Sequence, residues 1–256
     1  MKTLATILLS FIMILLWTYP SSAQVKNGYH DKLAALYEEG EYLDCAFKAE
    51  RMLMKDEYLS DPEVYLYLAI SYNKIYLMTK EDPTIIQDEP EYAKAYDNAL
   101  KYAADSKKKD KKAKEFFPDN NDLLEEIVYT GLPIAEQYIF EKKYSKALAL
   151  YRKFLKLIDN LHISFIKGVM DLYTLDKATA NEEFKKVFAA IEQNSLTTND
   201  NTKYLMKTGF LMYYDFLLQE DSVANADSAK HVLRYAVRLF PEDREINQRF
   251  FPSSKQ

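Results

Sequence analysis

Apolar residues recur at steps of three and four along most of the chain, and this spacing predicts helices. The segment from 144 to 158 shows it most fully, with apolar side chains at Tyr144, Ala147, Leu148, Tyr151, Phe154, Leu155 and Ile158. Such a stripe lies on one face of a helix, which can then pack against a neighbour. The 256 residues include only 5 glycines and 8 prolines, whereas a sheet protein needs many more tight turns. We therefore predict an all-α protein.

Small residues at a fixed offset predict helices that pack closely in pairs. A small or apolar residue in one helical segment is followed twelve residues later by a small residue in the next, at Leu33 and Cys45, Ala135 and Ala147, and Gly168 and Ala180. Apolar residues follow the second small residue on the same helix face, as Phe184 and Val187 follow Ala180. The small residue lets the neighbouring helix come close, and the larger ones fill the gap beside it.

This pattern resembles the tetratricopeptide repeat family, whose unit is an antiparallel helix pair of about 34 residues. The residues that carry the resemblance are Leu33, Leu36, Gly40, Glu41, Tyr42 and Cys45; Tyr65, Leu68, Ala69, Tyr72, Tyr92, Ala95 and Ala99; Ala135, Tyr138, Tyr144, Ala147 and Tyr151; Gly168, Ala180 and Phe184; and Ala229, Ala236 and Pro241. They span most of residues 24–251. The resemblance implies a right-handed α-solenoid of about four to five such pairs.

The sequence departs from the family pattern at several places. Cys45 replaces the usual alanine, and bulky residues stand at other positions where the family prefers alanine. An acidic, proline-containing insertion is expected from about 79 to 90 and a shorter one from about 220 to 227. A lysine-rich joint at 106–120 is expected to separate the second pair from the third. Pro133 should kink the next helix or mark its start.

The first 23 residues have the pattern of a cleaved secretory signal. Lys2 precedes an apolar run from Leu4 to Trp17, and small residues follow Pro20. The alternative is a retained membrane anchor, but a spanning helix needs roughly 20 apolar residues and this run is shorter. We expect cleavage after Ala23, an exported protein that is periplasmic or secreted, and a disordered tail at 252–256.

Charge and motifs argue against several classes of function. Without Lys2 the chain has 33 basic and 39 acidic side chains, which gives no electrostatic reason to expect nucleic acid as a partner. No phosphate-binding glycine loop, nucleophile elbow or metalloprotease motif occurs. His30, His162 and His231 lack metal-ligand spacing, and Cys45 is expected to be a buried, inert thiol. We therefore expect no catalytic residue, no cofactor and no metal, although residues distant in sequence can still form an active site in a repeat fold.

Two surfaces are candidates for binding. In the tetratricopeptide family the first helix of each pair lines a concave groove that holds a peptide or partner helix, and the resemblance places there Ile70, Asn73, Lys74, Glu136, Ile139, Phe140, Val169, Leu172, Tyr173, Tyr213 and Tyr214. The alternative is that these aromatic residues only fill the core. The one strong charge cluster is a possible polyanion contact and comprises Lys107, Lys108, Lys109, Lys111, Lys112 and Lys114. The interpretation that we favour is a solvated helix end, where cations complement the helix dipole and need no partner.

The sequence thus predicts an exported scaffold that binds another protein or peptide through its groove, as an accessory part of a cell-envelope assembly. The alternative is a binding module for a glycan or a peptidoglycan fragment, because the 21 tyrosines include side chains that could stack on sugars.

Overall fold

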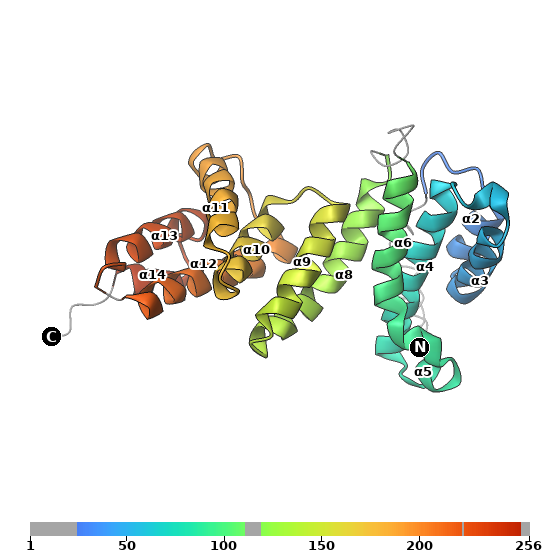
Figure 1. Cartoon of the computed structure of the whole chain (residues 1–256), viewed down its shortest axis with the longest axis horizontal. Coiled ribbons are helices and arrows are strands. Elements are labelled where there is room, and N and C mark those ends of the chain that lie inside the picture. Colours follow the sequence, from blue (N-terminus) through green and yellow to red (C-terminus); the bar gives the residue numbers. More distant parts are fainter. Residues whose placement is uncertain (1–24, 111–118, 222, 252–256) are drawn as a thin grey trace, which may run out of the picture. The chain divides into compact units, whose positions relative to one another are not determined.

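The computed structural model describes residues 25–110, 119–221 and 223–251. The regular structure in these ranges consists of twelve α-helices and two 3-10 helices (Figure 1), which confirms the all-α prediction there. The expected signal, the tail at 252–256 and Lys111, Lys112 and Lys114 lie outside the described residues. The chain divides into two compact units, one ending at Leu124 and the other beginning at Glu125. We refer to them as unit 1 and unit 2 and describe each by itself.

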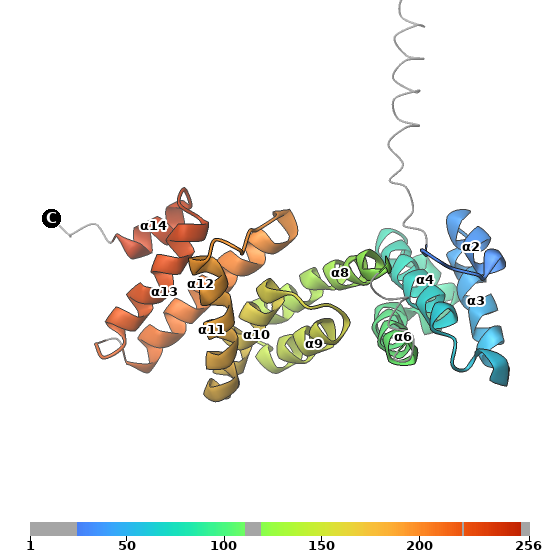
Figure 2. The same cartoon turned by 90° about the horizontal axis from the view of Figure 1, so that it is seen from above.

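Unit 1 is built around one long buried helix. Its helices are α2 (Asp31–Glu38), α3 (Tyr42–Leu53), η1 (Asp56–Tyr58), α4 (Pro62–Glu81), α5 (Thr84–Asp88), η2 (Pro90–Lys94) and α6 (Ala95–Lys109). α4 lies between α3 and α6 (Figure 2), and 12 of its 20 residues are buried. Most of the expected insertion at 79–90 is helical, because it contains the last residues of α4 and the whole of α5.

The segment before α2 is tied to the rest of unit 1 by polar contacts. Glu63, at the start of α4, is fully buried and accepts hydrogen bonds from the backbone N–H groups of Tyr29 and His30 at 2.9 to 3.0 Å. Asn120 exchanges two hydrogen bonds with the backbone of Lys26. Because buried polar groups need partners, these contacts fix the path of the segment.

Unit 2 has α10 at its centre. α8 (Asn121–Phe140) crosses the boundary between the units, and it is followed by α9 (Tyr144–Leu157), α10 (Leu161–Tyr173), α11 (Lys177–Glu192), α12 (Asp200–Glu220), α13 (Ala226–Leu239) and α14 (Arg244–Phe250). α10 contacts α9, α11 and α12, and 10 of its 13 residues are buried. α8 continues through Pro133, so this proline does not mark the start of the helix.

The small residues allow the close packing that the sequence predicts. A Cβ added to Gly168 of α10 would lie 3.0 Å from the ring of Phe184 on α11, which is closer than real Cβ atoms normally come. Ala147 and Ala180 are fully buried, as are Tyr151 and Phe154 of the apolar stripe on α9.

Several helices end in the same kind of turn. The second residue after the helix takes a positive φ, and the N–H of the residue that follows it donates to the carbonyl five positions earlier in the chain. The four residues are Gly40 (φ 81°), Lys142 (58°), Leu175 (71°) and Asn194 (54°), and the closing bonds are 2.8 to 2.9 Å long. Glycine and asparagine tolerate this conformation, whereas leucine does so poorly.

Candidate functional site

The turn between α10 and α11 holds an exposed leucine in the left-handed conformation. The side chain of Leu175 is 83 % exposed and its φ is 71°. This conformation costs a residue with a Cβ about 1 to 2 kcal/mol, and glycine is the usual residue at this place in the turn. Leucine at this position therefore neither suits the backbone conformation nor adds a buried side chain to the core.

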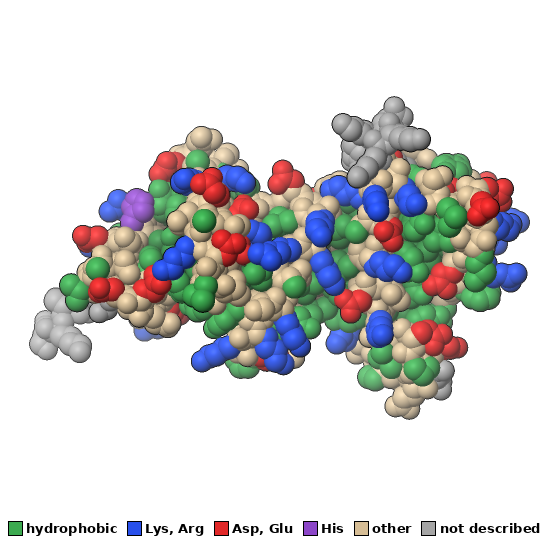
Figure 3. Space-filling model, viewed as in Figure 1, with side chains coloured by type: hydrophobic (Ala, Val, Ile, Leu, Met, Phe, Trp, Pro, Cys, Tyr) green, Lys and Arg blue, Asp and Glu red, His purple; other side chains and the backbone are tan. Residues whose placement is uncertain are grey.

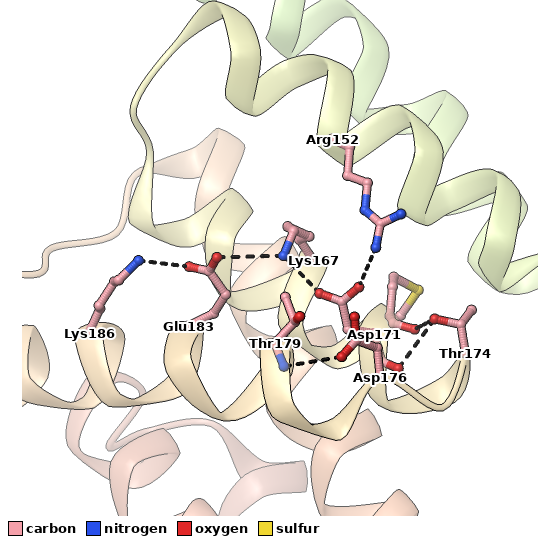
Figure 4. A network of polar contacts seen from close by, with 9 residues as sticks. Arg152, Lys167, Asp171, Thr174, Asp176, Thr179, Glu183 and Lys186 are labelled. Atoms are coloured by element: carbon pink, nitrogen blue, oxygen red, sulfur yellow. Dashed lines mark hydrogen bonds and ion pairs between the residues drawn. The ribbon is translucent and has the colours of Figure 1, made fainter.

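An ionic network centred on a buried carboxylate supports this turn. The carboxylate of Asp171 is fully buried and accepts from Lys167 Nζ at 2.8 Å and from Arg152 Nη2 at 3.0 Å (Figure 4). Lys167 Nζ also lies 3.5 Å from a carboxylate oxygen of Glu183, so the network joins α9, α10 and α11. The backbone carbonyl of Asp171 accepts the 2.8 Å bond from Asp176 N–H that closes the turn. Since buried charges require partners, the network leaves this region little freedom to shift.

The far side of the turn is also fixed. The Asp176 side chain caps α11 by accepting from the backbone N–H of Thr179. Hydrogen bonds from Thr179 lower the pKa of Asp176 below its usual value. On the near side, the hydroxyl of Thr174 donates to the carbonyl of Met170 at 2.9 Å. Leu175 is thus exposed on a turn that hydrogen bonds hold on both sides.

A row of aromatic rings lies beside this turn. The ring centroid of Tyr173 is 4.6 Å from that of Tyr144 on α9 and 5.3 Å from that of Phe216 on α12. Its hydroxyl donates to the backbone carbonyl of Met212 at 3.1 Å, and burial raises its pKa to about 12. We call Tyr144, Tyr173, Leu175 and Phe216 the aromatic edge of unit 2.

The end of α12 completes this surface. All eight residues from 211 to 218 are half-buried, although seven of them are hydrophobic. Lys177, two residues after Leu175, forms an ion pair with Glu220 and lies 5.9 Å from the ring centroid of Phe216. Lys177, the first residue of α11, therefore links the start of α11 to the end of α12.

The predicted groove residues fall in both units. Ile70, Asn73 and Lys74 belong to α4 of unit 1, and the other eight belong to unit 2. A single groove formed by residues of both units stays a prediction. Four of these residues are buried and pack within their unit, namely Ile70, Asn73, Val169 and Leu172. The half-buried ones are Lys74, Glu136, Ile139, Tyr173, Tyr213 and Tyr214. Phe140, at the end of α8, is 89 % exposed.

Within unit 2, the structure brings only part of this set to one place. Tyr173 joins the aromatic edge, whereas the ring of Tyr213 stacks on Phe184 of α11 at 4.2 Å. Tyr214 lies beneath the guanidinium of Arg249, which also pairs with Asp215. Burial raises the pKa of Glu136, so this carboxylate is less readily charged than an exposed one.

The described lysines of the charge cluster occupy the last turn of α6. Lys107, Lys108 and Lys109 are the last three residues of that helix, where cations complement the helix dipole. Lys109 Nζ lies 5.5 Å from the ring centroid of Tyr65. A polyanion contact here stays a prediction.

Leu175 and Phe216 were not predicted as site residues. The segment Tyr173-Thr174-Leu175-Asp176 contains no glycine that would signal a left-handed residue. A possible signal was Asp176, a good N-cap residue placed just before a helical pattern, because it implies that Leu175 lies in a short turn.

Three further observations concern the described residues. In the described ranges, no group of His, Cys, Asp and Glu side chains is arranged to hold a metal ion. No described helix combines the length and hydropathy needed to cross a membrane. Cys45 is fully buried, as predicted, and burial raises the pKa of its thiol to about 11.

Comparison with protein-family models, with curated proteins and with solved structures finds no match for this chain.

Proposed function

We propose that the protein is a helical-repeat scaffold that binds a protein partner through the aromatic edge of unit 2. The observation that carries the proposal is Leu175, a large apolar side chain that is 83 % exposed at a left-handed position. Its backbone conformation costs the free protein stability, and its side chain contributes little in return because most of it stays in water. Strained residues cluster at ligand-binding sites. Burial of the Leu175 side chain by a partner would offset the cost of its backbone conformation.

The surroundings of Leu175 support a protein as the partner. Interfaces are enriched in tyrosine and phenylalanine at their centre and are polar at the rim. Here Tyr173, two residues before the leucine, packs against Phe216, and Lys177 forms an ion pair with Glu220 and lies close to the Phe216 ring. Full burial of a leucine is worth about 1.5 to 3 kcal/mol. Leu175 and its neighbours could therefore dominate the binding energy.

We further propose that the helices are arranged as tetratricopeptide-like pairs in a solenoid. The recurring helix-ending turn supports this proposal, because Lys142 and Leu175 occupy the same place in it and are 33 residues apart. That spacing is close to the repeat length of about 34 residues. From the pattern of residues 1–23 we propose that the scaffold is exported and acts in the cell envelope or outside the cell.

Affinity capture from the source cells tests the binding proposal. The parent protein is compared with Leu175→Gly, which removes the side chain and suits the left-handed backbone. Tyr204→Ser is the matched control, because Tyr204 is a 60 % exposed aromatic residue of α12 in the same unit. We expect a protein that the parent and the control capture and that Leu175→Gly loses.

A partner held equally by all three proteins would contradict the proposed site. Failure to capture any protein, together with glycan binding that Leu175→Gly abolishes, would replace the scaffold function by a glycan-binding one.

A further inference from the structure

A second candidate binding surface lies in unit 1, on α2, α3 and the residues that follow α3. These elements form a hollow of about 620 Å³. Its apolar lining includes Phe47, which is 58 % exposed, and Met54, which is 82 % exposed, together with Leu36 and Met52. Figure 3 shows hydrophobic side chains with basic ones beside them in this part of unit 1. Exposure of a large aromatic residue and a methionine within one hollow is typical of a docking site.

The charge of the hollow is opposite to that of the chain as a whole. Lys48, Arg51 and Lys55 line it together with a single carboxylate, that of Asp44, although acidic residues outnumber basic ones by 39 to 34 in the sequence. None of the three cations forms an ion pair with a described carboxylate. They are therefore available to the carboxylates of a partner.

The lining residues form two stripes along α3. Phe47, Arg51 and Met54 follow steps of four and three, and Lys48, Met52 and Lys55 follow the same steps one residue later. The Arg51 guanidinium carbon lies 5.7 Å from the centroid of the Phe47 ring. The hollow therefore offers an aromatic ring for apolar contacts beside a guanidinium that can donate two hydrogen bonds to one carboxylate. From Asp44 to Leu53, the end of α3, the helical rise is about 14 Å, which matches about two and a half turns of a bound helix.

We propose that this hollow binds an amphipathic helix of a partner protein, with apolar residues facing Phe47 and Met54 and acidic residues facing Lys48, Arg51 and Lys55. A helix fills a hollow with residues at i, i+3, i+4 and i+7. A membrane surface fits less well, because lipid-binding helices present a protruding apolar face and not a depression. The proposal concerns unit 1 and does not depend on the aromatic edge of unit 2.

A synthetic peptide tests it directly. The probe is a fluorescently labelled helical peptide of about five turns, with leucine at i, i+3, i+4 and i+7 and glutamate at the other positions. The control peptide has lysine in place of every glutamate. Fluorescence anisotropy of the purified protein should show saturable binding of the acidic peptide, at least about tenfold tighter than that of the basic one. The affinity should fall as salt is raised from about 0.05 to about 0.3 M.

Variants locate the site. Phe47→Ser and Arg51→Glu should each weaken binding of the acidic peptide about tenfold or more. Tyr204→Ser and Lys203→Glu, at exposed positions of α12, should leave it unchanged. Should Phe47→Ser lose helix content by circular dichroism, Met54→Ser replaces it, because Met54 lies beyond the end of α3.

Three results would overturn the proposal. The first is equal affinity for the acidic and basic peptides, or no effect of Arg51→Glu. The second is self-association in sedimentation analysis that Phe47→Ser removes, which would assign the hollow to a second copy of the chain. The third is binding to phosphatidylserine vesicles, lost in Phe47→Ser, without binding to the acidic peptide.

Discussion

Replacing Leu175 by glycine should stabilise unit 2, although glycine destabilises most helical positions. Removal of the Cβ at a φ of 71° relieves about 1 to 2 kcal/mol. The greater conformational freedom of glycine in the unfolded chain lowers the free energy of unfolding by about 0.4 to 1 kcal/mol. Because the side chain is 83 % exposed, lost burial costs only about 0.4 kcal/mol. The net gain is about 0.4 kcal/mol.

A comparison with Leu175→Ala isolates the backbone contribution. Alanine loses the same buried area and keeps the Cβ, so Leu175→Gly should be about 0.8 kcal/mol more stable than Leu175→Ala. Gly40→Ala should show the reverse, a loss of about 1 kcal/mol, since Gly40 has a φ of 81° and a Cβ there would meet no atom within 4 Å. Asn194→Gly should change little, because asparagine tolerates this conformation.

Hydrogen exchange read by mass spectrometry measures this effect in unit 2 itself, because it reports the opening of each helix and not only the unfolding of the whole chain. Exchange of α10 and α11 should be about fourfold slower in Leu175→Gly than in Leu175→Ala. Faster exchange in the glycine variant would refute the reasoning, because it would show that a Cβ at position 175 does not strain the folded protein.

Three other predictions concern buried groups. Asp171→Asn should destabilise unit 2 by about 3 kcal/mol in urea unfolding, because the buried Lys167 loses its main counter-charge, and a loss below about 1 kcal/mol would contradict this. Cys45, whose thiol pKa burial raises to about 11, should react with iodoacetamide at pH 8 about a hundredfold more slowly in the folded than in the unfolded protein, and equal rates would refute its burial. Burial lowers the pKa of His162, so the unfolded state binds a proton more readily and stability should fall as the pH drops through about 6.5. In His162→Gln the unfolding free energy should lose this pH-dependent contribution. The same pH dependence in the variant and the parent would contradict its assignment to His162.

The sequence predicted the helices and many of their buried faces because local periodicity records burial directly. Ala147, Tyr151 and Phe154 of α9 illustrate this, since each is fully buried at a three- or four-residue step. Gly168 was recognised for a similar reason, because a small residue at a fixed offset has no other common explanation than a close helix contact.

Periodicity is less informative where a helix is covered on several sides. The groove prediction included Ile70 and Val169, yet α4 and α10 contact several neighbours and bury both residues. Lys167 and Asp171 are four residues apart, as in a surface ion pair, so their burial is not visible in the sequence. The positive φ of Leu175 depends on hydrogen bonds across the turn, and no glycine reveals it.

Site-specific photocrosslinking tests the central claim, that the aromatic edge binds a protein, most directly. A photoreactive phenylalanine analogue is placed at Leu175, and at Tyr204 as the control, and the source cells are irradiated. We predict a discrete protein adduct from position 175 and none from position 204. No adduct at 175, or the same adducts from both positions, would contradict the claim.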